Sequence, residues 1–155
     1  MATRRSAALY RVIGIVGTSR IVTRVHPFLY RLVGGRGPVG RHLGVLNVIV
    51  SISGRASGKV RDVPLYAFPD EDRFVLIGSN GGGDREPAWC ANLRANPEAR
   101  LLVGRASRAV RAYEAQGSER NRLWALAADG YPGYEVYRAR TSRTIPVVVL
   151  EPAGE

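Results

Sequence analysis

The segment SGRASGKVRDVPLY, residues 53–66, gathers two glycines, two serines and three cations between two apolar runs. The cations are Arg55, Lys59 and Arg61. Glycine lets backbone N–H groups approach a ligand, and concave runs of N–H groups bind phosphate. An arginine adds two-point hydrogen bonding to a phosphate or a carboxylate. The segment therefore predicts either an anion site or a solvated turn, because glycine-rich turns are also common.

A second glycine-rich loop, Ser79–Gly83, precedes a helix that we expect to begin near Pro87. The free N–H groups at the start of a helix suit an anion. Trp89 follows within the first turn and has two interpretations, one wall of a flat pocket or ordinary core packing. A third such loop covers residues 104–107.

Tyr131, Tyr134 and Tyr137 stand three residues apart and share one face if the segment is helical. A tyrosine supplies an aromatic wall and a proton donor, and its hydroxyl favours a half-wet cleft over a dry core.

Conventional catalytic sets are missing from the sequence. One cysteine and two scattered histidines give no metal-ligand spacing, and no G-x-S-x-G or Walker-type loop occurs. An enzyme of this kind would depend on an organic cofactor.

The net charge of +10 is concentrated in one part of the 155-residue chain. Residues 1–61 hold ten Arg, one Lys and no acid, which gives +11, whereas residues 62–155 sum to −1. This distribution predicts a localised anionic partner, either a surface or a small molecule. It argues against nucleic acid as the partner, because basic and aromatic residues do not interleave. The single cysteine favours the cytoplasm as the compartment.

Residues 4–34 carry apolar side chains at three- and four-residue spacings, which predicts one or two helices. Two interpretations of this basic segment stay open: packing against the rest of the fold, or lying on an anionic membrane face. The longest uncharged runs, 12–19 and 43–54, are shorter than the ~20 residues that a membrane span needs.

The remainder predicts a mainly β fold with helices, of the α+β class. Runs rich in β-branched residues predict about six strands, at residues 43–53, 60–68, 73–79, 99–103, 108–115 and 145–150. Few helices separate them and β-α-β alternation is missing, so we expect a small barrel with helical additions. We divide the chain into a basic amphipathic helical segment, residues 1–40, and a barrel domain, residues 41–152.

These stretches together resemble the deazaflavin-dependent nitroreductase family of actinobacteria. The likeness is carried by SGRASGKVRDVPLY, IGSNGGGDREPAWCANLRANP, ERNRLW and YPGYEVYRARTSRTIPVVVLEP, in that order, over about residues 43–152. The resemblance implies an FMN-binding-like split β-barrel. It also implies coenzyme F420, a 5-deazaflavin with a phosphodiester and an oligoglutamate tail, which would donate hydride from carbon 5 to a quinone or a nitroaromatic compound.

The resemblance also assigns site residues. The residues expected to bind the cofactor are Arg55, Ala56, Ser57, Arg61, Asp62, Val63, Pro64, Leu65, Tyr66, Ile77, Gly78, Ser79, Asn80, Ala88, Trp89, Cys90, Ala91 and Asn92, and we add Lys59 on charge alone. The residues expected to shape the acceptor side are Tyr66, Ser79, Tyr131, Tyr134 and Tyr137. Tyr134 is our first choice to donate a proton or a hydrogen bond to the acceptor.

The resulting expectation is a cytoplasmic F420H2-dependent oxidoreductase, a nitroreductase or quinone reductase, with peripheral membrane contact and a homodimeric state as further hypotheses. Two alternatives stay open: FMN as the cofactor on the same fold, and a non-catalytic F420-binding carrier. The chain departs from the family pattern at Ala56, often a lysine there, and at Cys90, often a tyrosine or a histidine.

Overall fold

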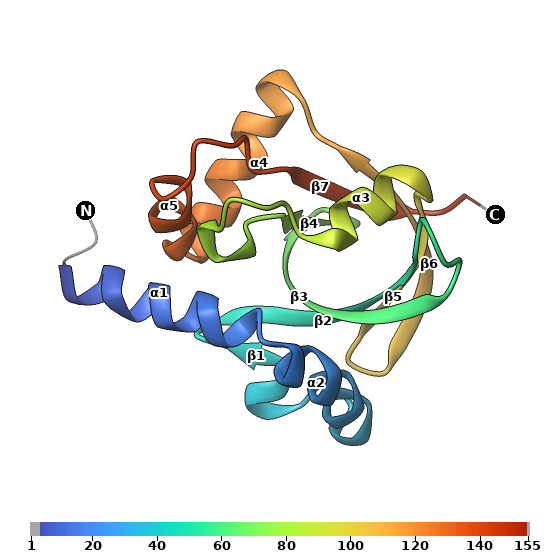
Figure 1. Ribbon diagram of the computed structural model, residues 1–155. Helices are drawn as coiled ribbons and strands as arrows, with labels where there is room; N and C mark the ends of the chain where they lie inside the picture. The colour runs from blue at the N-terminus through green and yellow to red at the C-terminus, as the bar shows by residue number, and fades with distance from the viewer. Residues whose placement is uncertain (1–3, 155) are drawn as a thin grey trace.

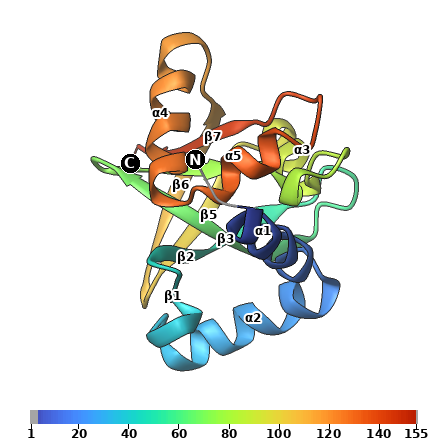
Figure 2. The ribbon, with the colours of Figure 1, turned by 90° about the vertical axis from the view of Figure 1, so that its left-hand side faces the viewer.

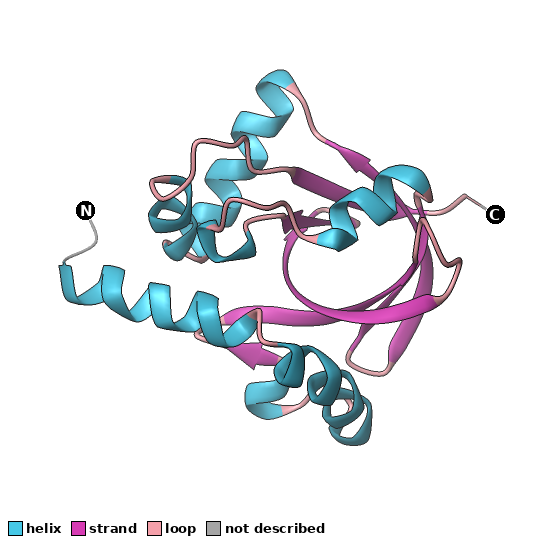
Figure 3. Cartoon of the chain, in the orientation of Figure 1, coloured by secondary structure: helices cyan, strands magenta, loops and turns pink. Residues whose placement is uncertain are grey.

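Runs of β-branched and aliphatic residues form the strands of a closed antiparallel β-barrel (Figures 1 and 3). The computed structural model describes residues 4–154. Within that range the strands are β1 (Arg41–His42), β2 (Val45–Ser53), β3 (Val60–Asp70), β4 (Arg73–Ile77), β5 (Glu98–Val103), β6 (Ala106–Glu114) and β7 (Val147–Pro152). Their order is β1-β2-β3-β4-β7-β6-β5, and an additional β2–β5 pairing closes a six-stranded ring with β1 outside it.

Five α-helices in residues 4–154 surround the barrel: α1 (Arg4–Gly17), α2 (Arg20–Val33), α3 (Ala88–Ala95), α4 (Gly117–Gly130) and α5 (Gly133–Arg138). Two 3-10 turns lie in the connections: η1 (Gly37–Val39) between α2 and β1, and η2 (Asn80–Gly82) between β4 and α3. In Figure 2, α4 lies above the barrel and α2 below it, and α1 lies between α2 and α5, where it contacts α5 and η2. None of the helices in this range combines the length and the apolarity that crossing a bilayer requires.

The predicted fold class, a barrel of about six strands with N-terminal helices, is confirmed. The prediction missed β1, since two residues carry no alternating pattern. The hairpin from β1 to β2 turns at Leu43 and Gly44, which both have positive φ, as a two-residue turn of this type requires. The division at residue 40 stays a prediction, and its first three residues lie outside the described range.

Alternate residues along the strands belong to two apolar clusters on opposite faces of the sheet. One cluster draws on all six barrel strands and on α3, with Val48, Leu76 and Leu101 fully buried, so it fills the barrel. The other lies between the barrel and helices α4 and α5, where Trp124 packs with the tyrosines of α5. Core side chains therefore fill the barrel interior, and a ligand must bind outside the barrel or at its end.

The buried side chain of Tyr30 joins helix α2 to the barrel. Tyr30 is 1% exposed, and its hydroxyl donates to the carbonyl of Asn47 at 3.0 Å. The same hydroxyl accepts the N–H of Gly104 at 2.8 Å. Ser19 caps the start of the helix by accepting the N–H of Val22, and Gly34 ends it in the left-handed region.

We predict that Tyr30→Phe lowers the free energy of unfolding by about 1–3 kcal/mol, because the buried Asn47 carbonyl and the half-buried Gly104 N–H both lose their hydrogen bond to the Tyr30 hydroxyl. Denaturant unfolding measures this change. Leu32→Ala on the same helix is the control, since Leu32 is 66% exposed and should change stability by less than about 0.5 kcal/mol. Equal midpoints for native protein and Tyr30→Phe would contradict the anchoring role.

Candidate cofactor and acceptor site

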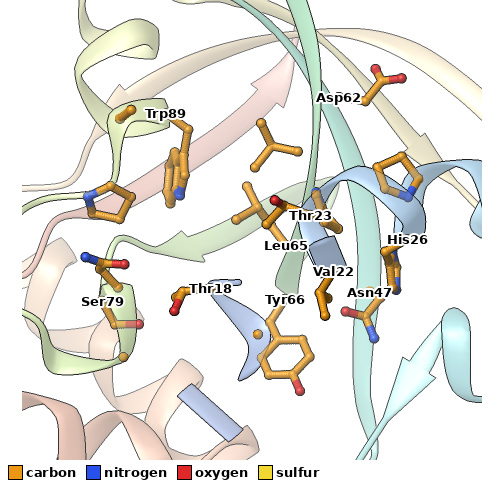
Figure 4. Close-up of a pocket in the computed structure, with 18 of the residues that line it drawn as sticks. Thr18, Val22, Thr23, His26, Asn47, Asp62, Leu65, Tyr66, Ser79 and Trp89 are labelled. Atoms are coloured by element: carbon orange, nitrogen blue, oxygen red, sulfur yellow. The ribbon is translucent and has the colours of Figure 1, made fainter. Parts of the chain in front are cut away.

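A cavity of about 1680 Å³ lies between the barrel and the N-terminal helices (Figure 4). Its walls are β2 and β3 with the loop between them, the η2 turn with the start of α3, and the facing sides of α1 and α2. Tyr131, Tyr134 and Tyr137, from the segment around α5, complete the lining. Pockets for a single small molecule commonly measure about 300–1,000 Å³, so this cavity has room for a cofactor and a second molecule.

Eighteen of the twenty-two predicted site residues line this one cavity. They are Arg55, Ala56, Ser57, Arg61, Asp62, Val63, Pro64, Leu65, Tyr66, Ile77, Ser79, Asn80, Ala88, Trp89, Asn92, Tyr131, Tyr134 and Tyr137. The loop after β2, the loop after β4 and the tyrosine segment, far apart in the sequence, therefore meet in space. The part that each residue takes in binding stays a prediction.

Lys59, Gly78, Cys90 and Ala91 do not line the cavity. Gly78 and Cys90 pack against each other beneath the wall, where a Cβ on Gly78 would lie 2.6 Å from the thiol sulfur. Cys90 is 1% exposed, and burial raises the pKa of its thiol, so it is a core residue and not a reactive one. Lys59 is exposed, and its backbone N–H donates to the Ser57 hydroxyl.

The loop after β2 is an ordered turn fastened to α3. Its ends are joined by the Gly54 N–H, which donates to the Lys59 carbonyl, and by the Gly58 N–H, which donates to the Gly54 carbonyl. Arg55 donates both its backbone N–H and its guanidinium to the side-chain oxygen of Asn92, at 3.1 and 2.8 Å. The sequence could not reveal this link, because 37 positions separate the two residues.

Positive charge dominates the cavity wall. Its arginines are Arg20, Arg24, Arg31, Arg55 and Arg61, drawn from α2 and from the β2–β3 region. Asp62 is the only acid among the described lining residues, and Arg31 and Ser51 both donate to it. Burial works to raise the pKa of Asp62, but these two hydrogen bonds outweigh it and lower the pKa. The carboxylate is thus ionised and paired, and the remaining arginines leave the cavity suited to an anion.

Trp89, Leu65 and Ser79 line one part of the same cavity, which we call the flat slot because an indole ring forms one of its walls. In Figure 4, Trp89 from α3 and Leu65 from β3 project into the same part of the cavity, with Ser79 nearby. Trp89 is only 8% exposed and packs with the barrel cluster, so both interpretations of this residue hold: it is core on one side and cavity wall on the other. The N–H groups of Ala88 and Trp89, at the start of α3, have no acceptor within the helix, and both residues line the cavity, whereas the N–H of Cys90 donates to the Pro87 carbonyl.

The three tyrosines differ in whether their hydroxyls are already hydrogen-bonded within the protein. Tyr131 and Tyr137 lie 2.9 Å apart, and Tyr137 donates its proton to the carbonyl of Tyr10 at 2.8 Å. Tyr131 must then donate to Tyr137, so both protons are engaged within the protein. Among the described side chains, 7–154, none hydrogen-bonds to the Tyr134 hydroxyl. Burial raises the pKa of Tyr134, so that this phenol keeps its proton at neutral pH.

Sequence reasoning missed Arg143, which holds the η2 loop in place from outside the cavity. Its guanidinium donates to three carbonyls, those of Gly78 at 3.1 Å, Ser79 at 2.7 Å and Gly83 at 2.9 Å. Arg143 lies within the R-x-I-P-V stretch that carried the resemblance, but no spacing in the sequence pairs it with a loop 60 positions earlier.

Comparisons with known proteins identify the family of this chain. A family model described as F420H2-dependent quinone reductase matches residues 22–152. The chain belongs to that family. An F420H2-dependent quinone reductase of Mycobacterium tuberculosis is 33% identical over 132 residues, which cover 82% of this chain and 87% of that protein. The resemblance inferred from the four sequence stretches is thereby confirmed, and the family description names F420H2 as the reductant.

Two solved structures share the fold. An F420H2-dependent reductase, FDR-A, is 35% identical with a TM-score of 0.64, and the match covers 68% of this chain and 93% of that one. A structure described as a domain-swapped dimer is 29% identical with a TM-score of 0.67, and it covers 86% of this chain and 100% of its own. The match to the family begins at residue 22, so α1 lies outside it.

We predict that Arg143→Ala weakens F420 binding although Arg143 does not border the cavity, because it releases three carbonyls that shape the η2 loop. The free energy of unfolding should also fall, by about 2–3 kcal/mol. Fluorescence titration and denaturant unfolding measure the two effects. Arg111→Ala, a change at an exposed residue of β6, is the matched control and should alter neither. Native affinity in Arg143→Ala would show that the loop holds its shape without the arginine.

Proposed function

We propose that this protein catalyses the transfer of hydride from F420H2 to a quinone, and that nitroaromatic compounds are further acceptors. The observation that carries the proposal is that one cavity is lined by arginines, by Trp89 with Leu65, and by Tyr131, Tyr134 and Tyr137. Membership of the F420H2-dependent quinone reductase family supports the choice of both reactants.

The residues present fit the coenzyme. Arg55 and Arg61 would hold the phosphodiester and the acidic tail, and the free N–H groups at the start of α3 would add neutral donors. Trp89 and Leu65 would flank the ring. When bound, F420H2 supplies hydride from carbon 5 of its deazaflavin. Fixing the ring and the acceptor in one cavity lowers the entropic part of the barrier.

Tyr134 is the residue that we assign to the acceptor oxygen. Its proton is held by a raised pKa and is not engaged by described side chains, so the hydroxyl can donate a hydrogen bond to an oxygen that gains negative charge. Tyr131 and Tyr137, whose protons are engaged, would form the aromatic wall that positions the acceptor.

Two other functions share most of these features. FMN has a flat ring and a phosphate but no oligoglutamate tail, and so it would leave the outer part of the basic wall unused. A carrier would bind F420 without oxidising it. The tyrosine-lined space next to the ring slot favours an enzyme over a carrier, because a carrier has no need of room for a second molecule.

We predict that native protein oxidises F420H2 when menadione is added, and that Tyr134→Phe lowers kcat on the order of 10²-fold by removing a donor to the acceptor oxygen. The affinity for F420 should stay unchanged. Tyr113→Phe is the control, because the Tyr113 hydroxyl bonds to Arg73 and Glu119 and lies off the cavity. A nitroaromatic compound replaces menadione to test the wider acceptor range. Tight F420 binding without turnover would establish the carrier function instead.

We also propose that α1 and α2 bring this protein to the cytoplasmic face of the cell membrane. Ten of the thirteen exposed large apolar residues of the described chain lie on these two helices, including Ile15 at 65%, Ile21 at 77% and Phe28 at 68% exposure. Exposed arginines flank them, and residues 1–61 contain no acid. An apolar face with cationic borders matches a bilayer of anionic lipid, and it adjoins the cavity that would take a membrane quinone.

We predict that the native protein sediments with phosphatidylglycerol–phosphatidylcholine vesicles and that the double change Ile21→Ser with Phe28→Ser weakens binding about 10-fold or more, through lost apolar burial. High salt should weaken binding as well. Leu126→Ser, on α4, is the control. Unchanged sedimentation of the double variant would remove the membrane assignment. Elution as a dimer that the same two changes dissociate would assign the face to a second copy, as the domain-swapped relative suggests.

A further inference from the structure

His42 contacts the hydroxyl of a tyrosine that lines the cavity. The Nδ1 atom of His42 and the hydroxyl oxygen of Tyr66 lie 2.7 Å apart. The two rings are stacked, with centroids 6.3 Å apart and an interplanar angle of 24°. His42 is exposed to solvent and Tyr66 is half-buried, and both border the cavity. The pair therefore connects bulk water with the interior of the site.

The backbone holds His42 at this place. The two-residue turn at Leu43 and Gly44 has positive φ at both positions, which is uncommon for leucine, and the guanidinium of Arg41 donates to the Gly44 carbonyl at 2.7 Å. His42 pairs with Val45 in the short ladder between β1 and β2. Across β2, Tyr66 pairs with Asn47, which lies two residues after Val45 and so shares its face of the sheet. Both rings consequently project from the same face.

The other tyrosines of the site lack such a connection. Tyr131 and Tyr137 pass their protons to each other and to the Tyr10 carbonyl, which has no proton to return. Tyr134 is 4% exposed and packs against Phe68 and Tyr131, and no described side chain hydrogen-bonds to its hydroxyl, so no described side chain links it to solvent. Tyr66 packs on Tyr131 with ring centroids 5.2 Å apart, which puts it within the same cluster.

We propose that Tyr66 and His42 form a proton relay that delivers one proton from solvent to the acceptor oxygen during quinone reduction. The proposal rests on the function proposed above and adds His42, which lies outside the motifs that carried the family resemblance. In this relay Tyr134 orients the acceptor oxygen and Tyr66 donates a proton to that oxygen. His42 then reprotonates Tyr66.

The step balances as follows. A quinone takes up one hydride and one proton to become a hydroquinone, and both electrons arrive with the hydride, so the relay carries protons only. The Tyr66 O–H bond breaks and its proton bonds to the acceptor oxygen, while the proton on Nδ1 of His42 passes to the Tyr66 oxygen. A proton from solvent bonds to Nε2 of His42 as Nδ1 gives up its proton, so the ring stays neutral and is left as the Nε2–H tautomer. Exchange of the ring nitrogens with solvent then returns the proton to Nδ1 before the next turnover.

The surroundings suit this task. Burial, and next the nearby Tyr137, raise the pKa of Tyr66 to about 12. Tyr66 is therefore protonated when the acceptor binds, and its phenolate is a strong enough base to take a proton from His42. The charged group beside His42 on its own hairpin is Arg41, whose guanidinium is turned to the Gly44 carbonyl. Residues 1–61 contain no acid, so neither the hairpin that carries His42 nor β2 beside it bears a carboxylate.

The first test uses native protein, His42→Asn and His42→Ala in single-turnover oxidation of F420H2 by menadione, in H2O and in D2O. His42→Asn is the matched variant, because its amide can donate to Tyr66 from the Nδ1 position but cannot carry a proton. We expect both variants to lower the rate at least about 10-fold with unchanged F420 affinity. We expect free imidazole to restore part of the rate in His42→Ala and none in a His42→Ala, Tyr66→Phe double variant.

A native rate in both His42 variants, or no rescue of His42→Ala by imidazole, would overturn the relay. If native protein does not oxidise F420H2 at all, the proposed function fails instead, so the two failures are distinct. A second measurement needs no turnover: ¹⁵N NMR of the native protein should show the His42 proton on Nδ1, with its signal moved in Tyr66→Phe. A proton on Nε2 with Nδ1 unprotonated would contradict the relay directly.

Discussion

Closure of the barrel by the β2–β5 pairing is the constraint on which the rest of the structure depends. Once the ring is closed, residues such as Val48 and Leu101 are committed to its interior, and binding groups must come from loops and helices around it. On β3 the strict alternation sends Leu65 to the barrel cluster and Tyr66 to the cluster of α5. Two neighbouring residues thus belong to two different apolar clusters and still line the same cavity.

Much of this architecture was predictable from local patterns. Runs of β-branched residues predicted the six barrel strands, and the glycines, serines and arginines of residues 53–66 predicted a loop that does reach the cavity. The spacing of Tyr131, Tyr134 and Tyr137 predicted one shared face on a single helix. All three border the same space, but Tyr131 follows α4 and precedes α5, so the predicted single helix was wrong. Each of these signals lies within a few residues of chain, where backbone period and turn chemistry decide the outcome.

What escaped prediction depends on contacts between distant residues. His42 looked like an isolated histidine, and only the β1–β2–β3 register brings its ring to Tyr66. Arg143 acts through three loop carbonyls that carry no side-chain signal. The helices α1 and α2 were predicted, but the sequence could not show that they form a cavity wall on one side and expose apolar residues on the other. Such roles follow from tertiary arrangement and not from composition.

The central claim is that the basic wall beside the flat slot binds the acidic tail of F420. The most direct measurement is a fluorescence titration of the protein with F420, with FMN, and with the tail-less deazaflavin ring, repeated for Arg55→Ala and Arg61→Ala. The account predicts tight binding of F420, weaker binding of the other two, and a loss in both variants that is confined to F420. Equal affinity for F420 and the tail-less ring, unchanged in the two variants, would contradict it.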